Sequence, residues 1–189
     1  MDLSIITVTW NSKDLIEKQI RSVQAGCKNI SYEQIIADNA SVDGTVEMIE
    51  KKFGATVVPT FDCHPCEGRD LSLANKDSGS GAGMTIKVLK NNKNAGFSFS
   101  NNQAAKISSG DFLLFLNPDM QVEEGSLDKM VEWICRHPDV GLASCKLVDE
   151  HGKLNKDAQP RRFPGLLDQV AILLKIHHIF PSILNKYLY

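Results

Sequence analysis

Residues 112–120 read FLLFLNPDM, five apolar residues followed at once by an amide, a proline and a carboxylate. An unbroken apolar run of this length is typical of a strand covered on both faces, as at the centre of a parallel sheet. Asn-Pro-Asp has turn composition, so the strand should end at residue 116. Ligands bind beyond the carboxyl ends of the strands in open parallel sheets. We therefore predict that Asp119 lies at a ligand-binding edge, although a turn alone would also explain it.

Two earlier segments also consist of an apolar run followed by polar residues. Residues 3–10 are apolar or β-branched on both faces, and residues 32–37 contain the run QIIA. Each is followed by a polar turn, so both should be strands that end at the same edge as the first. The polar residues at these two ends are Thr9, Asn11, Asp38 and Asn39. Asn11 suits a helix cap as well as a ligand contact.

Between the strands, apolar residues recur at helical spacing. This spacing predicts helices from residue 13 to 26, around 46–53, from 97 to about 108 and over 127–135. Further strands are expected at 55–58, 86–89 and 140–148. The alternation of strand and helix with short turns predicts an α/β fold with a Rossmann-like, mainly parallel sheet flanked by helices.

Two segments interrupt this alternation. Residues 59–85 are rich in Gly, Ser and Asp, which predicts a flexible surface insertion. Residues 163–189 are apolar and helical in pattern over 166–179, without the polar face of a free-standing helix. We predict a domain over 1–162 and a separate C-terminal segment over 163–189. That segment would pack on this domain, a second copy, a membrane surface or further chain.

The composition is that of a globular protein. The 189 residues are 42% hydrophobic and 23% charged, with a net charge of -2, which gives no reason to expect nucleic acid as a partner. Five irregularly spaced cysteines suggest reduced thiols, and neither a signal peptide nor a membrane span is evident, so we expect a cytoplasmic location. Cys63 and Cys66 resemble half of a zinc site, but no second pair has suitable spacing, so a loop with incidental thiols is expected.

Amides accumulate beside the predicted edge. They belong to Asn94, Asn102 and Asn117, and Gly96 lies between the first two. Several amides with two carboxylates suit a site that reads a base and ribose by hydrogen bonds. Such a site would hold phosphate through a divalent metal.

Four stretches carry a resemblance to a known family. They are LSIITVTWNS at residues 3–12, IIADNASVDGTVEMI at 35–49, the segment from NNKNAG to FLNPDM at 91–120, and HPDVGLASCKLVDEHGKL at 137–154. Through them the chain resembles the family 2 glycosyltransferases, and most of all the rhamnosyltransferase-type branch. The resemblance implies a GT-A fold. It also implies transfer, with inversion, of a sugar from a UDP- or dTDP-sugar to a saccharide or lipid-linked saccharide in cell-surface polysaccharide assembly.

The resemblance also implies roles for particular residues. Asp38 would contact the nucleobase, and the Asn94–Gly96 turn with Asn102 would lie along the nucleotide. Asn117-Pro118-Asp119 stands where the family has its DxD motif, so Asp119 would be the metal ligand and Asn117 a helper. Both Mg²⁺ and Mn²⁺ suit such oxygen ligands.

The general base is the missing part of the pattern. In the family this carboxylate follows the strand expected here at 140–148, and no matching motif occurs before Tyr189. The chain has acidic residues in this region, but the pattern places none of them correctly: Asp149, Glu150, Asp157 and Asp168. We therefore expect the chain to be the donor-binding part of a transferase that is cut short before its acceptor half.

Two other functions are alternatives to an active glycosyltransferase. One is a nucleotide-binding module that cannot transfer sugar and dimerises through its apolar C-terminal segment. The other is a nucleotidyltransferase, which would need a basic, Gly-rich loop after the first strand that residues 9–12 do not provide. The Arg161–Arg162 pair before the apolar segment is expected to be solvated, with contact to a phosphate or to anionic lipid at the inner face of a membrane as the functional alternative.

Overall fold

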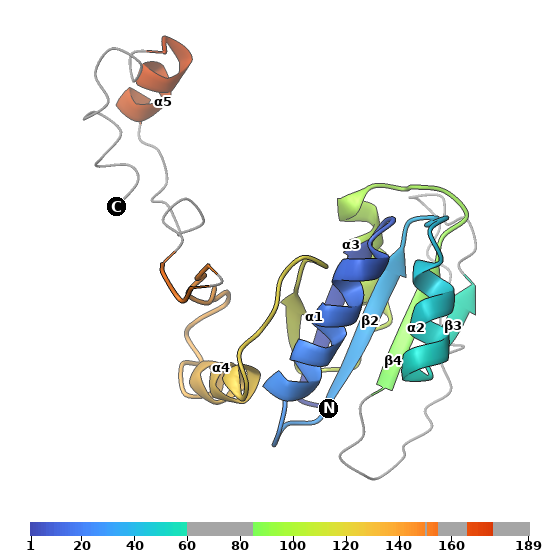
Figure 1. Ribbon diagram of the computed structural model, residues 1–189. Coiled ribbons are helices and arrows are strands. Elements are labelled where there is room, and N and C mark those ends of the chain that lie inside the picture. Colours follow the sequence, from blue (N-terminus) through green and yellow to red (C-terminus); the bar gives the residue numbers. More distant parts are fainter. Residues whose placement is uncertain (60–84, 150, 155–165, 176–189) are drawn as a thin grey trace. The chain divides into compact units, whose positions relative to one another are not determined.

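A computed structural model describes residues 1–59, 85–149, 151–154 and 166–175. They divide into two compact units, residues 1–138 and residues 139–189. The first unit holds a five-stranded sheet in the order β3-β4-β2-β1-β5, in which every pairing is parallel (Figure 1). Its elements are β1 (Leu3–Thr9), α1 (Lys13–Gly26), β2 (Tyr32–Asp38), α2 (Thr45–Phe53), β3 (Thr56–Pro59), β4 (Thr85–Lys90), α3 (Phe97–Lys106), β5 (Phe112–Phe115) and α4 (Ser126–Cys135). The predicted parallel α/β sheet is confirmed.

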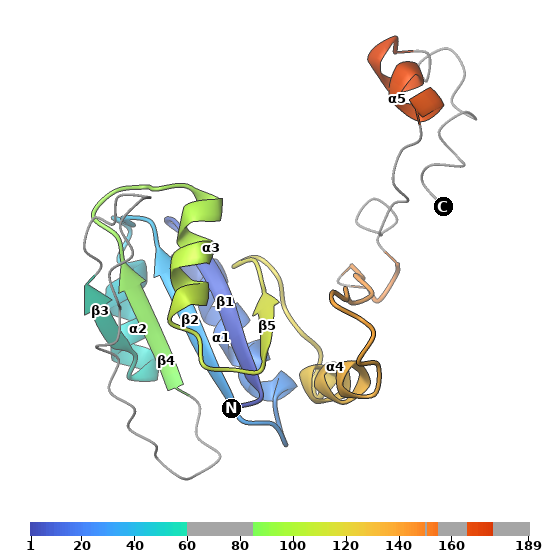
Figure 2. The ribbon, with the colours of Figure 1, turned by 180° about the vertical axis from the view of Figure 1, so that it is seen from behind.

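Helices cover both faces of this sheet. Helices α1 and α2 lie on one face, and α3 lies on the other (Figures 1 and 2). Strand β2 lies between β1 and β4, and all seven of its residues are buried, which is why its composition is apolar on both faces. One core cluster lies under α1 and α2 and includes Ile16, Ile20, Ile36, Ile49 and Val88. Another lies under α3 and includes Ile6, Ile35, Ala37, Leu89 and Ala104.

The position predicted for the strand at 112–116 was wrong. Strand β5 is an edge strand, not a central one, and it pairs only with β1 among the described strands. Leu114 packs into a core cluster with residues of α1 and α4, whereas Leu113 and Phe115 are 44% and 52% exposed. The apolar run correctly predicted a strand that ends before Asn117. Its composition did not reveal that, among the described residues, one face of this strand is left partly exposed.

At the opposite end of the sheet, where the parallel strands begin, a partly buried ion pair joins β2 to β4. Glu33 of β2 is 1% exposed, and its carboxylate accepts a hydrogen bond from Lys87 Nζ of β4 at 2.8 Å. The same carboxylate accepts hydrogen bonds from the Ser4 hydroxyl at 2.7 Å and from both the backbone N–H and the hydroxyl of Ser109. These contacts fix the turn that leads from α3 into β5.

The second unit differs from its prediction. Residues 140–148 form no strand; the only strand-like pairing there is an antiparallel bridge between Val148 and Leu154. Leu142 in this segment is 90% exposed. An apolar segment becomes a strand only where a partner strand pairs with it, and this explains why the predicted strand is absent. Helix α5 (Leu166–Leu173) lies within the predicted helical segment. Among the described residues, no helix has both the length and the hydropathy needed to cross a bilayer.

Several predictions fall outside the described residues. The proposed insertion lies almost wholly within 60–84, which includes Cys63 and Cys66, and Arg161–Arg162 is also outside. The division at residue 162 and the partner of the apolar segment remain predictions.

Candidate functional site at the carboxyl edge of the sheet

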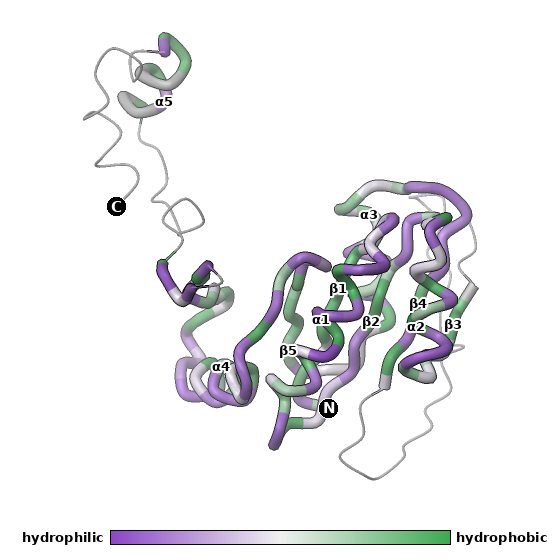
Figure 3. The backbone as a smooth tube through the Cα atoms, in the orientation of Figure 1, coloured by the Kyte–Doolittle hydropathy of each residue, from purple (hydrophilic) through white to green (hydrophobic). Residues whose placement is uncertain are grey.

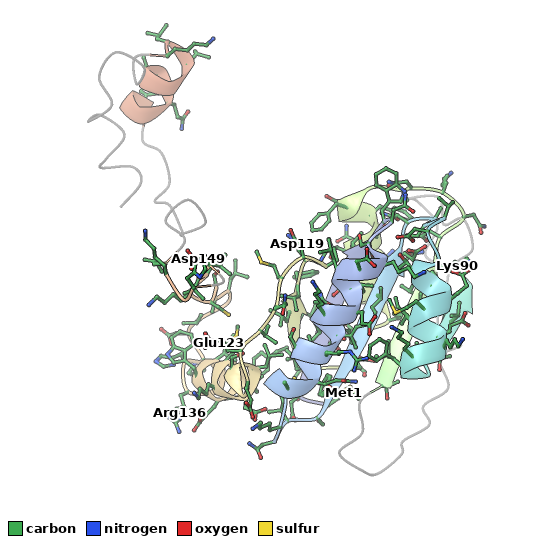
Figure 4. The ribbon with its side chains drawn as sticks, in the orientation of Figure 1. Met1, Lys90, Asp119, Glu123, Arg136 and Asp149 are labelled. Carbon is green, nitrogen blue, oxygen red and sulfur yellow. The ribbon has the colours of Figure 1, made fainter. Side chains whose placement is uncertain are left out.

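The structure brings the predicted strand ends to one edge. Because all five strands are parallel, the chain leaves β1, β2, β4 and β5 at the same side of the sheet. Thr9 of β1 pairs in register with Asp38 of β2, and Asp38 pairs with Lys90 of β4. Figure 4 shows Lys90 and Asp119 towards this end of the sheet, with Met1 towards the other. Figure 3 shows hydrophilic residues in the loop that connects β4 to α3 at this edge.

Asp38 is fully buried at the tip of β2. Its two carboxylate oxygens accept hydrogen bonds from the hydroxyl and, at 2.9 Å, the backbone N–H of Ser41. Burial raises the pKa of Asp38 above its usual value, and the two bonds from Ser41 and the charge of Lys90 only partly oppose this effect. Beside it, Thr9 is 1% exposed, and its hydroxyl has no hydrogen-bond partner among the described residues. The site therefore contains two buried oxygen groups next to each other.

Each of these two strand ends is followed by a turn that contains a strained residue. Asn11 and Ala40 both have positive φ, 49° and 60°, a conformation that residues other than glycine adopt at a cost. The Asn11 side chain accepts a hydrogen bond from the Val42 N–H at 2.9 Å, and the Asn11 N–H donates one to the Ser41 hydroxyl at 2.8 Å. Asn11 thus joins the end of β1 to the turn after β2 and does not cap α1.

Asp43 connects the starts of two helices. Its carboxylate accepts hydrogen bonds from the Lys13 N–H at 3.1 Å, at the start of α1, and from the Thr45 N–H at 3.0 Å, at the start of α2. Some loss of hydration acts to raise the pKa of Asp43, but the hydrogen bonds from Thr45 and Lys13 outweigh it and lower the pKa. Asp43 therefore satisfies backbone N–H groups at the starts of both helices.

Asn39 lies in a buried amide cluster. Its side-chain oxygen accepts hydrogen bonds from the Ser100 hydroxyl at 2.7 Å and from the Asn91 amide at 3.1 Å. These bonds tie the end of β2 to the end of β4 and to α3. Asn39 is 3% exposed, and both acceptor positions of its side-chain oxygen are occupied, so its role here is to hold the three elements together.

The segment before α3 is exposed at the same edge. Asn94 accepts a hydrogen bond from the Gly96 N–H at 3.0 Å, which forms a tight turn directly before the helix. Gly96 has φ +87° and ψ 162°, a conformation that favours glycine. Asn102 is exposed on α3, six residues after Gly96 and so about 9 Å further along the helix. The structure thus places Asn94 and Gly96 at the strand ends, with Asn102 further down the helix.

Asp119 lies in a β-turn that follows β5. The Asn117 carbonyl accepts a hydrogen bond from the Met120 N–H at 3.1 Å, with Pro118 and Asp119 at the two central positions. The Asn117 and Asp119 side chains are exposed. Within the described residues, no group of three or more His, Cys, Asp or Glu side chains could enclose a metal ion. A single exposed carboxylate does fit the kind of Mg²⁺ or Mn²⁺ site in which a diphosphate and water supply the other ligands.

Sequence reasoning missed two kinds of residue at this edge. Trp10 and Phe97 are each 58% exposed, at the end of β1 and at the start of α3. Two lysines also lie here: Lys90 at the tip of β4 and Lys13 near the Gly44 turn, where its Nζ would lie 3.4 Å from a Cβ added to that glycine. Their positions at the ends of strands or the starts of helices were the available signal, but a single aromatic or lysine is too common to identify a site.

The chain is similar in sequence to known proteins. The model of glycosyl transferase family 2 matches residues 4–60 and 73–184. The O-antigen biosynthesis protein RfbC of Myxococcus xanthus is 51% identical over 53 residues, which are 28% of this chain and 4% of that protein. A dolichol-phosphate mannosyltransferase of Pyrococcus furiosus is 22% identical over 144 residues, 76% of this chain and 33% of that protein.

Solved structures confirm the predicted GT-A fold. TarS 1–349 of S. aureus matches with a TM-score of 0.54 at 21% identity, over 73% of this chain and 33% of that one. The complex of TarS 1–349 with UDP-GlcNAc matches with a TM-score of 0.53 at 23% identity, over 73% of this chain and 32% of that one. The chain thus spans about a third, or less, of the length of these relatives.

Proposed function

The chain belongs to glycosyl transferase family 2, and on this premise we propose that the carboxyl edge of its sheet binds the donor, a UDP- or dTDP-sugar. The observation that carries the proposal is the convergence of Thr9, Asp38 and the Asn117–Met120 turn on one edge. The UDP and UDP-GlcNAc complexes of TarS, whose fold this chain shares, also support a nucleotide-sugar donor.

The nucleobase would lie at the ends of β1 and β2. Uracil and thymine both present an N3–H donor, for which the Asp38 carboxylate is a suitable acceptor. Ser41 occupies one acceptor position on each oxygen, so a second remains on each. The exposed indole of Trp10 offers a flat surface for stacking on the base. Asn94, Gly96 and Asn102 would lie along the rest of the nucleotide, and Asn39 would support them from the buried cluster.

The diphosphate would lie towards the turn that carries Asp119. Asp119 would hold a Mg²⁺ or Mn²⁺ ion, with Asn117 as a helper, and Lys13 and Lys90 would add positive charge at the same edge. When bound, such an ion neutralises charge on a leaving nucleoside diphosphate. The metal would be shared with the donor, because no group of three or more His, Cys, Asp or Glu side chains among the described residues could enclose it.

The reaction would be an inverting glycosyl transfer. An acceptor hydroxyl oxygen forms a bond to the anomeric carbon, and the bond from that carbon to the phosphate oxygen breaks. The nucleoside diphosphate leaves with the electron pair, and the hydroxyl proton passes to a base that we do not assign. The similarity to an O-antigen biosynthesis protein supports a saccharide acceptor in cell-surface polysaccharide assembly.

Calorimetry tests donor binding. UDP, dTDP and GDP are titrated into the chain with and without Mn²⁺. We expect UDP or dTDP to bind, and Mn²⁺ to strengthen the binding. If none of the three nucleotides binds under either condition, the donor-site assignment is wrong.

A matched pair of variants tests Asp119. Asp119→Ala should remove the strengthening by Mn²⁺ while leaving the melting temperature unchanged, because the side chain is exposed. Glu123→Gln, an exposed acidic residue four positions later, is the control and should behave like the parent chain. Equal Mn²⁺ dependence in all three chains would show that Asp119 is only a turn residue.

A transfer assay separates the enzyme from a binding module. Transfer or donor hydrolysis by the 189 residues would show that they contain the catalytic base. Tight donor binding with no turnover would instead favour the nucleotide-binding module.

A further inference from the structure

The segment that carries Asp119 lies along one side of helix α1. The Gln19 amide donates a hydrogen bond to the Asn117 carbonyl at 3.1 Å. The Val122 N–H donates to the Ser22 hydroxyl at 3.2 Å, and the Gly125 N–H donates to the Ala25 carbonyl at 3.1 Å. Positions 19, 22 and 25 are three residues apart, so they share one side of the helix. Asp119 therefore lies between two attachments to the same rigid element.

Gln19 is the buried member of this series. Its side chain is 0% exposed and stands in the apolar stripe of α1 between Ile16 and Val23. Its amide nitrogen donates to the Thr7 hydroxyl at 2.9 Å and to the carbonyls of Leu116 and Asn117 at 3.3 and 3.1 Å. Since a carbonyl oxygen can only accept, the amide nitrogen must face the turn.

A second glutamine fixes the orientation of the first. The amide nitrogen of Gln34 in β2 donates to the Gln19 side-chain oxygen at 2.7 Å. Gln34 is also 0% exposed. With its oxygen held by β2 and its nitrogen shared among β1 and the turn, the Gln19 amide has one favourable orientation.

The ordinary explanation is a buried polar residue that simply satisfies its hydrogen bonds. The direction of the bonds indicates that Gln19 also holds the turn that carries Asp119. Strand β5 ends at Phe115, so the carbonyls of Leu116 and Asn117 lie beyond the strand residues paired with β1. The Asn117 carbonyl is also the acceptor that closes the turn around Asp119. Gln19 therefore holds the first residue of the turn from inside the core.

We propose that Gln19 is a positioning residue for Asp119, and that it fixes the turn in the orientation that metal-dependent donor binding requires. This inference rests on the proposed function. Gln19 itself touches neither metal nor donor; it acts through the carbonyls of Leu116 and Asn117. Groups that orient a metal ligand in this way typically contribute roughly 10- to 100-fold to metal affinity.

The test compares UDP affinity with and without Mn²⁺ by calorimetry, using the full chain. Gln19→Leu removes the amide with little change in volume. We expect the strengthening by Mn²⁺ to fall at least about tenfold, while the affinity for UDP without metal stays within about twofold. A purely structural role would lower both affinities together.

Thr7→Val is the matched control. It removes one buried hydrogen bond of Gln19, at 2.9 Å, but leaves the two bonds to the turn. We expect the effect of Mn²⁺ on UDP affinity to be unchanged in this variant. If Gln19→Leu does not fold, Gln19→Met, whose flexible side chain has a similar length, replaces it in the same measurements.

The outcomes separate the two proposals. If the parent chain binds UDP more tightly with Mn²⁺ and Gln19→Leu does the same to an equal degree, the positioning role is wrong and the donor site stands. If the parent chain binds no nucleotide, the proposed function fails, and the inference fails with it. A loss of Mn²⁺ dependence in Thr7→Val equal to that in Gln19→Leu would also overturn the inference.

Discussion

Asp38 has a structural contact in the fold, and we propose a ligand contact for the same carboxylate. Its carboxylate is held by Ser41 at the tip of β2, and burial raises its pKa because the charged form loses hydration. A position at which the fold tolerates a poorly solvated carboxylate is a candidate for function. Its neighbour Thr9, with no partner for its hydroxyl in the described part of the chain, strengthens this interpretation.

Asp38→Asn should weaken UDP binding. The amide has only one acceptor oxygen, so it cannot both keep the two bonds from Ser41 and accept the base N3–H. We expect a loss of about tenfold or more in affinity, with and without Mn²⁺, measured by calorimetry. An unchanged affinity would show that Asp38 is only part of the turn.

Glu33 predicts a pH dependence of stability. Burial acts to raise its pKa, but the bonds from Lys87, Ser4 and Ser109 outweigh it, so the pKa in the folded state lies below its usual value of 4.5. A lowered folded pKa means that ionised Glu33 stabilises the fold above pH 4.5, and that this contribution is lost as the pH falls below 4.5.

The matching variant is Glu33→Gln. At pH 7 we expect its free energy of unfolding to fall by about 3 kcal/mol, because Lys87 loses its partner. The difference from the parent chain should shrink below pH 4.5 in urea denaturation at several pH values. A difference that stays constant from pH 7 to pH 3 would contradict the role of this ion pair.

Helix α1 is the element on which both the core and the site depend. One side packs on the sheet through Ile16, Ile20 and Val23, and an adjoining side holds the segment that carries Asp119. Near its end the approach is so close that a Cβ on Gly26 would lie 2.8 Å from Val122 Cγ2. A glycine in the last turn of this helix is therefore a packing requirement.

Gly26→Ala should destabilise the first unit. Alanine favours a helix by about 1 kcal/mol, but the overpacking against Val122 should cost about 1–3 kcal/mol. We expect a lower melting temperature by circular dichroism. Val122→Ala in the same chain should recover part of the loss, because it removes the methyl group that the new Cβ meets. A Gly26→Ala chain more stable than the parent would show that the loop yields without cost.

In the first unit as a whole, the strand order places the apolar run of β5 at an edge. Leu113 and Phe115 are exposed on one face, whereas Ile5 of the neighbouring β1 is 0% exposed. Similar residues in adjacent strands therefore contribute unequally to stability.

Phe115→Ala should cost less than about 1 kcal/mol, whereas Ile5→Ala should cost about 2–5 kcal/mol. Urea denaturation of the two variants measures both values. Equal losses would mean that another part of the protein covers this face of β5.

The amino-acid pattern alone was sufficient for the strands and helices of the first unit, for the parallel sheet and for the edge at which polar residues gather. Apolar periodicity and turn residues are local signals, and parallel strands necessarily end on one side. The pattern predicted neither the edge position of β5 nor the absence of a strand at 140–148, since both depend on which segments pair. The pattern also did not predict a role for Gln19. A glutamine in an apolar stripe can be interpreted only when the tertiary structure shows that its amide donates to the carbonyls of Leu116 and Asn117, almost a hundred residues away.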